Sequence, residues 1–389
     1  MLGFIVRRLL SGIVVLFGVT LLVFILARVI PGDPCVAAYA EKATPQVCAA
    51  FAERYGLNDP IPVQFGIYLG VLNRDRDGVE ALLSNSGGLN FLPGFIGGGS
   101  NGIIHGDLDS SIRFGRPVVD IVVERLPVTV ELTLFALLFA VVIGIPLGIA
   151  SALRRNSPID VASMIGANLG VSTPVFVLGL LLQILFAVVL RGTFLSLPPS
   201  GRLSAGSLPP SIDQAWGLEG IDGVLGSLFT FFSNMYTVNA VLTLNGDLLV
   251  DAIRHLILPA VAVGTIPLAI IARITRSSLL EVLGLDYIRT ARAKGLRERV
   301  VVIRHGLRTA LLPVVTVIGL SIGAFLSGAV LTETIFNLTG IGRTILEAVN
   351  GRDYIMIQGI TLLVAMAYVI VNLLVDISYA VLDPRVRVS

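Results

Sequence analysis

The sequence predicts an all-α membrane protein with six transmembrane helices and two large external loop regions. Charged residues make up 14% of the 389 residues, hydrophobic residues make up 54%, and the mean hydropathy is +0.88. Soluble domains carry about 25% charged residues, so this composition is typical of an integral membrane protein. We therefore expect the lipid bilayer as its surroundings, and the small net charge of +2 gives no reason to expect a nucleic-acid partner.

Uncharged apolar runs long enough to cross a bilayer, about 20 residues, occur six times. The first follows Arg7 and Arg8; it is too long for a signal peptide and lacks a small-residue cleavage site, so we expect a retained span. The third exceeds one span, and we expect its Ala162–Leu169 end to lie at the interface. The runs are Leu9–Ala27, Leu132–Leu153, Val161–Leu190, Leu256–Ala272, Thr309–Thr332 and Tyr354–Val375.

The uncharged segment Gly223–Gly246 is a seventh candidate, but it contains many Ser, Thr and Asn residues. Counting it as a span would turn the Arg-rich loop around Arg289 outward, against the positive-inside rule. With six spans both termini lie in the cytoplasm, and the inside segments hold 15 of the 28 Lys and Arg residues. We therefore expect Gly223–Gly246 to be external structure on or near the membrane.

These spans divide the chain into five parts. Residues 1–30 form the N-terminal segment and first span, and residues 31–129 an external region with a Gly-rich linker, Gly87–Gly102. Residues 130–190 hold spans two and three, and residues 191–255 form a second external loop. Residues 256–389 hold spans four to six with a cytoplasmic loop at 277–308.

The sequence gives little reason to expect chemistry within this chain. No G-x-x-x-x-G-K-[ST] loop occurs, so the chain cannot hydrolyse ATP by that route. Three scattered histidines form no metal-binding pattern, and we expect no catalytic, cofactor-binding or metal-binding residue. Cys35 and Cys48 share the first external region; a disulfide and two independent thiols both remain open.

The cytoplasmic loop contains a short helix pattern between Asp286 and Gly295. Asp286 is placed to cap the start, Gly295 to follow the end, and Arg292 and Lys294 to interact with the helix dipole. Tyr287, Ile288 and Ala291 fall at helical spacing and give the helix an apolar face. We expect such a helix, held between two spans, to fit into a groove of a cytoplasmic partner.

Several segments together resemble the permease subunits of ATP-binding-cassette importers, in particular the dipeptide, oligopeptide and nickel group. The resemblance covers most of the chain, and its most specific part is Asp286–Gly295 with His305 and Leu312-Pro313. Unlike the general permease motif this stretch lacks a glutamate, which is typical of the peptide group. The external segments Asn73–Ile104 and Ser204–Asp251 are longer than usual. Further matching segments are Ile30–Pro34, Tyr55–Pro60, Gly106–Ser111, Arg125–Thr129, His255–Pro259 and Asn372–Asp376.

This resemblance implies the type I ABC importer permease fold in a prokaryotic inner membrane. It also implies a second homologous permease, two ATP-binding subunits that carry ATP and Mg, and an external solute-binding protein. The chain would form half of a translocation pathway that works by alternating access. The solute stays open among peptides, nickel chelates and sugars. The residues expected to couple to the ATPases are Asp286, Tyr287, Ile288, Arg289, Thr290, Ala291, Ala293, Lys294 and Gly295.

A second expected contact lies in the loop between spans five and six. Phe336, Asn337, Leu338 and Gly340 would touch the binding protein, with a plain connector as the alternative. An ion-coupled secondary transporter is the rival function; it would use an intramembrane carboxylate, for which Asp376 is the candidate. A scaffolding membrane protein is a third class, but it gives no reason for a capped cytoplasmic helix.

Overall fold

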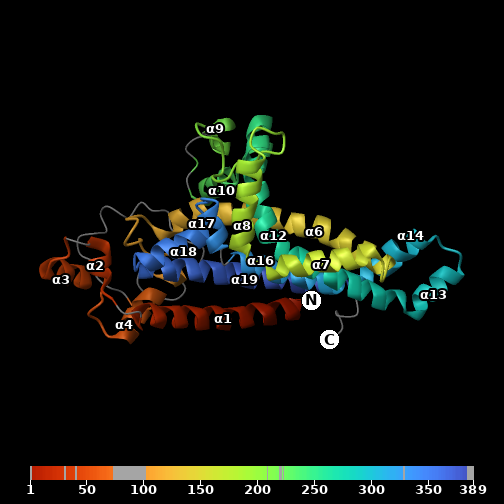
Figure 1. Ribbon diagram of the computed structural model, residues 1–389. Helices are drawn as coiled ribbons and strands as arrows, with labels where there is room; N and C mark the ends of the chain where they lie inside the picture. The colour runs from red at the N-terminus through yellow and green to blue at the C-terminus, as the bar shows by residue number, and fades with distance from the viewer. Residues whose placement is uncertain are drawn as a thin grey trace.

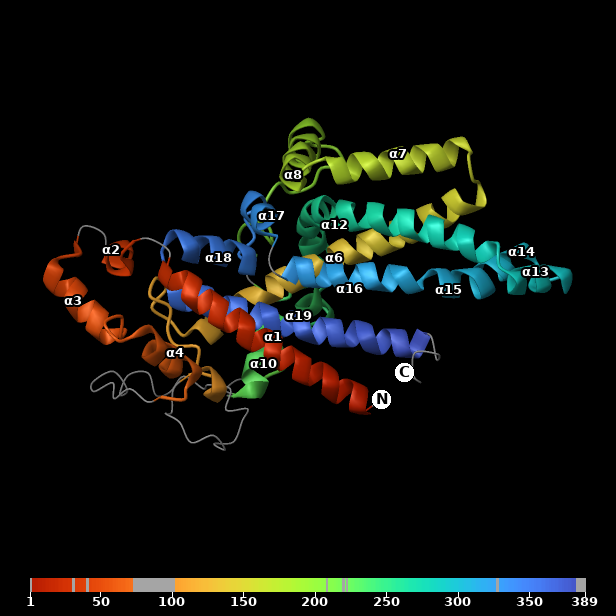
Figure 2. The same ribbon diagram turned by 90° about the horizontal axis from the view of Figure 1, so that it is seen from below.

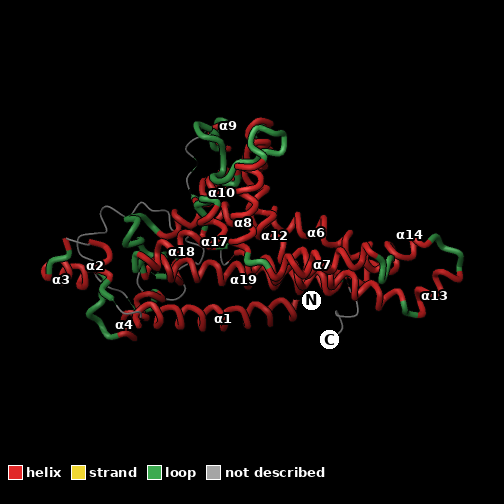
Figure 3. Tube along the Cα trace, in the orientation of Figure 1, coloured by secondary structure: helices red, strands yellow, loops and turns green. Residues whose placement is uncertain are grey.

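The computed structural model describes residues 2–29, 32–39, 42–72, 102–207, 209–218, 221, 223–326 and 329–382. Regular secondary structure in these ranges is helical apart from one isolated β-bridge between Ser110 and Pro117. The predicted all-α class is therefore confirmed for the described ranges (Figure 3). The predicted linker Gly87–Gly102 lies outside the described residues except for Gly102.

Four helices are each long and apolar enough to cross a membrane, and two bent helix pairs raise the number to six. The single helices are α1 (Leu2–Val29), α6 (Val118–Leu153), α12 (Gly246–Leu283) and α19 (Tyr354–Leu382). The first pair joins α7 (Pro158–Ser172) to α8 (Val175–Gln183) and the π-helix η3 (Ile184–Val189). The second joins α14 (Glu298–Val300), the π-helix η4 (Val301–Leu307) and α15 (Arg308–Ala310) to α16 (Leu312–Leu326).

Helices α6 and α12 form the centre of the bundle, and glycines allow their backbones to approach closely. A methyl group at Gly148 would lie 2.6 Å from the carbonyl oxygen of Ala272, and one at Gly264 would lie 2.6 Å from that of Ala136. Small residues favour close helix packing in membranes, where the lipid supplies no hydrophobic driving force between helices. These two positions therefore fix how α6 crosses α12.

Several expected boundaries differ from the structure; α6, for example, begins at Val118 and not at Leu132. The Ala162–Leu169 segment belongs to α7, which packs along α12. The chain then turns by 102° before α8. The part of the third span that is not aligned with the bundle is therefore α8 and not Ala162–Leu169 (Figure 2). Pro174 precedes α8 and disfavours helical backbone at the residue before it. The fourth span begins at Gly246, ten residues before the expected start, because Asn245 caps it by accepting a hydrogen bond from the Leu248 amide.

As expected, the segment Gly223–Gly246 does not form a single spanning helix. It forms two short helices, α10 (Val224–Ser233) and α11 (Tyr236–Leu242), which follow α9 (Ile212–Ala215). In Figure 1, α9 stands out from the side of the long bundle. This second external region is therefore a folded unit in the part that is described.

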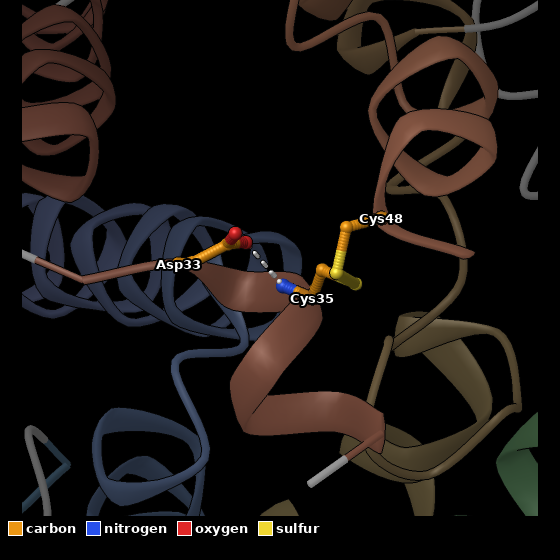
Figure 4. A group of neighbouring side chains, drawn as sticks. All are labelled: Asp33, Cys35 and Cys48. Carbon is orange, nitrogen blue, oxygen red and sulfur yellow. Dashed lines mark hydrogen bonds between the residues drawn. A yellow bond between two sulfur atoms is a disulfide. The ribbon is translucent and has the colours of Figure 1, made fainter. Parts of the chain in front are cut away.

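The first external region forms three short helices at one end of the bundle, opposite α13 (Asp286–Ala293) and α14 (Figure 1). They are α2 (Pro34–Tyr39), α3 (Pro45–Arg54) and α4 (Ile61–Leu69). The next described helix is the short helix η2 (Ile103–His105), which contacts α4. Cys35 of α2 and Cys48 of α3 form a disulfide (Figure 4). Of the two readings left open by the sequence, the structure therefore has the disulfide.

Asp33 lies beside this disulfide and accepts a hydrogen bond from the Cys35 amide at 2.8 Å (Figure 4). Its carboxylate and the two sulfur atoms lie within 4.8 Å of one another. Both sulfur atoms are already joined, so they offer no thiolate to a metal. Asp33 therefore acts here as a cap for the start of α2.

Candidate functional site

The short helix α13 runs from Asp286 to Ala293, within one residue of the expected bounds. The expected cap is wrong: Leu285, with extended backbone, precedes the helix, and Asp286 is its first residue. The Asp286 carboxylate instead pairs with Arg289 at 3.3 Å, on side chains that are 95% and 72% exposed. Gly295 follows the helix with φ +75°, as the glycine-after-helix pattern predicts.

The apolar face of α13 is buried within the chain itself. Ile288 is 0% and Ala291 6% exposed, and both belong to a cluster with Leu279, Val282 and Val301. The interpretation that this apolar face enters a partner's groove is therefore wrong for Ile288 and Ala291. They attach α13 to the end of α12 and to η4.

The opposite face of α13 is open to solvent. Tyr287 is 42% exposed, although its hydroxyl lies 3.3 Å from the Thr309 hydroxyl. Among the expected coupling residues the exposed ones are Asp286, Tyr287, Arg289, Thr290, Ala293, Lys294 and Gly295. We call these seven residues the open face of α13. It combines cations with small side chains, and a partner can approach it without disturbing the attachment through Ile288 and Ala291.

An ion pair stabilises the exit from α13. Arg292 donates two hydrogen bonds to Glu298, at 2.7 and 3.1 Å, across the turn that contains Gly295. The Glu298 carboxylate raises the pKa of the Arg292 guanidinium above its usual value, mainly through these hydrogen bonds. Because the side chains are 41% and 57% exposed, we expect the pair to orient the turn more than to stabilise the fold.

The chain after α13 contains a π-helix, η4, that sequence reasoning missed. Such segments are frequent at functional sites because the wider turn changes the helix register. Gly306 lies within it, and a methyl group there would be 3.2 Å from Leu279 of α12. The register change therefore holds the start of the fifth span against α12, directly beside α13.

A second feature missed from the sequence is the buried carboxylate of Asp160, at the start of α7. It is 3% exposed and accepts hydrogen bonds from Arg276 of α12 at 2.6 and 2.8 Å. Ser151 of α6 donates a third bond at 2.9 Å, and the Asn156 amide a fourth at 2.9 Å. These bonds tie α6, α7 and α12 together at the end of the bundle that carries α13.

The loop after α17 (Val330–Ile335) does not reach outward as expected. Phe336 and Leu338 are each 1% exposed, in a core cluster with Val128 and Leu132 of α6, and Gly340 is buried too. In this structure these three residues pack within the chain and offer no exposed surface to a binding protein, so the contact stays a prediction. Asn337 alone of the four is exposed; φ is +52° there and it accepts a hydrogen bond from Arg343.

Glu333 and Glu131 form the polar part of this core. Glu333 is 0% exposed; it accepts hydrogen bonds from the Thr129 hydroxyl at 2.7 Å and from the Arg343 amide at 2.9 Å, near the start of α18 (Ile341–Asn350). Burial raises the pKa of Glu333, and these hydrogen bonds oppose the rise. Glu131 is 2% exposed and binds Arg202 at 3.0 Å and the Thr237 amide at 2.7 Å.

Glu333→Gln is expected to lower the free energy of unfolding by about 1–3 kcal/mol, because the amide nitrogen of Gln replaces one carboxylate oxygen and cannot accept the hydrogen bond made there. The measurement is the Tm in detergent. Glu124→Gln is the control, since Glu124 pairs with Arg116 on the surface and is 49% exposed. Equal Tm values for the two variants would contradict this role of Glu333.

The intramembrane carboxylate required by the ion-coupled alternative is already paired. Asp376 of α19 forms a salt bridge with Arg8 of α1 at 2.9 Å. The pair brings the start of α1 and the end of α19 to the same end of the bundle (Figure 2). Asp376 lies near the end of α19, and its partner belongs to another long apolar helix.

Comparison with known proteins agrees with this architecture. The family model of the binding-protein-dependent transport system inner membrane component matches residues 144–388, and the model of its N-terminal region matches residues 1–85. The chain therefore belongs to this family of multi-pass membrane permeases, and the resemblance drawn from the sequence is confirmed.

Curated relatives align over the whole chain. The dipeptide transport system permease protein of Alkalihalophilus pseudofirmus is 41% identical over 100% of both chains. The dipeptide transport system permease protein of Escherichia coli strain K12 is 40% identical over 100% of this chain and 99% of its own. The di/tripeptide transport system permease protein of Pseudomonas aeruginosa is 41% identical with the same coverage.

Proposed function

We propose that this chain is the permease subunit of an ATP-driven importer of dipeptides and related short peptides. With a second homologous permease it would enclose the pathway, and an external solute-binding protein would deliver the peptide. Two ATP-binding subunits would carry ATP and Mg, and the chain itself would have no catalytic activity. The relatives named for dipeptide transport support the substrate class.

The observation that carries this proposal is the two-sided construction of α13. One side is fixed to α12 and η4 by Ile288 and Ala291, and the open face remains free for a partner. A partner that pushes or pulls on the open face therefore moves α12 and the start of the fifth span as one body. Alternating access requires such a connection between ATP hydrolysis and the membrane helices.

The proposed topology places both termini and α13 in the cytoplasm. The Arg8–Asp376 pair joins the two terminal helices toward the end of the bundle that carries α13 (Figure 1). Arg residues concentrate around α13, and short loops rich in Lys and Arg stay in the cytoplasm. The disulfide at the opposite end favours an oxidising compartment there.

The test is uptake of a labelled dipeptide into proteoliposomes that contain the complete complex. We expect uptake to require ATP on the side of the ATPases and the binding protein on the other side. Collapsing ion gradients with an ionophore is expected to leave uptake unchanged. Uptake that needs an ion gradient and proceeds without ATP would refute the proposal and favour the secondary transporter.

A further inference from the structure

A cavity of about 100 Å³, lined by apolar and polar groups, lies at the end of the molecule that carries α2 to α4. Its wall is formed by α1, α4, the 102–112 segment and α19. This end is remote from α13 (Figure 1), and none of the cavity's lining residues belongs to α13 or to its attachment. The lining residues that matter here are Arg28, Tyr68, Asp107, Tyr354 and Gln358.

Arg28 is held in a fixed orientation without a neutralising partner. Its Nε donates to the Gln64 side-chain oxygen at 2.7 Å, and one terminal nitrogen donates to the Phe24 carbonyl at 3.2 Å. The guanidinium carbon lies 3.4 Å from the centre of the Phe24 ring. No carboxylate among the described residues pairs with Arg28, so its remaining N–H groups are left to the cavity.

Gln64 explains why this orientation is fixed. Its side-chain nitrogen donates to the carbonyl oxygens of Leu57 at 3.2 Å and Asp59 at 2.7 Å. The side-chain oxygen is thereby directed at Arg28. A guanidinium whose orientation is set by neighbouring groups is prepared for the planar, two-point hydrogen bonding that it forms with a carboxylate.

The same cavity offers a negative charge and further hydrogen-bonding groups. One Asp107 oxygen accepts the Asp109 amide at 2.8 Å, and Asp107 pairs with no cation in the described part of the chain. Gln358 is 4% exposed, and its buried side-chain nitrogen has no hydrogen-bond partner among the described residues. Burial raises the pKa of Tyr68, so its hydroxyl stays neutral and able to donate.

We propose that this cavity binds a small zwitterion of amino-acid or dipeptide size, with its carboxylate at Arg28 and its ammonium group at Asp107. Two opposite charges line one cavity and do not pair with each other, and a ligand that carries both charges would neutralise both. Both side chains are half-buried, and charges that are partly removed from water are stabilised by such compensation. The site lies in the permease itself and goes beyond the proposed importer function.

The charges and the size of the cavity select this class of ligand. A phosphate ion would meet the Asp107 carboxylate, and a simple cation would meet Arg28. Pockets for drug-sized ligands have roughly 300–1,000 Å³, so about 100 Å³ suits only a smaller molecule. A dipeptide would extend one side chain through the open mouth.

The first experiment uses ligand analogues, which leave the protein unchanged. Binding of L-alanyl-L-alanine to the purified full-length chain in nanodiscs, without a binding protein, is measured by isothermal titration calorimetry. N-acetylation removes the ammonium charge, and a C-terminal amide removes the carboxylate. Each change is expected to weaken binding by about 10- to 100-fold, because it removes a charge-assisted hydrogen bond to a residue that is partly shielded from water.

Two variants assign each ligand charge to its residue. Arg28→Gln is expected to weaken dialanine binding about 10- to 100-fold while leaving affinity for the dialanine amide unchanged. Asp107→Asn keeps the oxygen that accepts the hydrogen bond from the Asp109 amide. It is expected to weaken the binding of dialanine and to leave the affinity for N-acetyl-dialanine unchanged. Arg116→Gln, on the surface near the start of α6, is the control and should bind dialanine normally.

No saturable dialanine binding by the wild-type chain would overturn the proposal, and so would equal affinity of wild type and Arg28→Gln for dialanine. Either result leaves the importer function untouched, because that function is tested by ATP-dependent uptake with the binding protein present. Conversely, loss of ATP-dependent uptake with intact dialanine binding would refute the importer and keep the cavity as a binding site.

Discussion

Gly295→Val is expected to reduce ATP-dependent uptake about tenfold or more, with little change in expression or Tm. Gly295 has φ +75°, a conformation that a β-branched residue avoids. No atom lies within 4 Å of the position of an added methyl group, so the effect comes from the backbone and not from a steric clash. A tilt of α13 relative to the η4 segment that follows it would relieve the backbone strain that Val has at this φ.

Gly295→Asn is the matched control for this prediction. Asn tolerates positive φ far better than Val, so Gly295→Asn is expected to retain most of the uptake. Both variants add a side chain at the same open position and differ in backbone preference. If Asn and Val reduced uptake equally, the backbone conformation at Gly295 would not be what coupling requires.

Asp160→Asn is expected to cause the largest fall in Tm, because it removes the negative partner of Arg276 and weakens the bonds that join three helices. Arg276 would lose its negative partner while its side chain is only 24% exposed. Because the Asp160 bonds join three helices beside α13, uptake should fall together with Tm. The measurement is Tm in detergent, followed by uptake at a temperature well below it.

Arg273→Gln is the control for this pair. Arg273 lies one turn before Arg276 on α12, is exposed, and donates to the Asn168 side chain at 2.9 Å. Its loss is expected to change stability by less than about 1 kcal/mol. The double variant Asp160→Asn with Arg276→Gln should be less destabilised than the sum of the single variants. Additive losses would show that the two residues act independently.

The features that the sequence predicted well depend on local patterns. The six apolar runs, the α13 boundaries and the glycine after α13 each follow from residues within one or two turns of each other. The N-cap was displaced by one residue because Leu285 adopts extended backbone just before the helix. Asn245 is an N-cap signal on which the expected boundary did not rest, and it lies eleven residues before the expected start of the fourth span.

The features that the sequence did not predict depend on contacts between distant residues. Arg276 and Asp160 are separated by 116 positions, and Glu333 and Thr129 by 204. The Ser-Pro-x-Asp pattern at Ser157–Asp160 is typical of a helix start, but it does not indicate which arginine binds Asp160. The loop at Phe336–Gly340 has the composition of an exposed connector, and only the fold shows that α6 covers it.

The most direct test of the central claim is co-purification of the ATP-binding subunits with this chain in mild detergent. We predict that co-expressed ATPase subunits and a second permease stay bound to the wild-type chain. Ala293→Trp, on the open face of α13, should lose the ATPases and keep the second permease. Leu244→Trp is the control, because Leu244 lies in the second external region and is 91% exposed. This variant should keep both the ATPases and the second permease. ATPases that remain bound to Ala293→Trp as tightly as to wild type would contradict the account of α13.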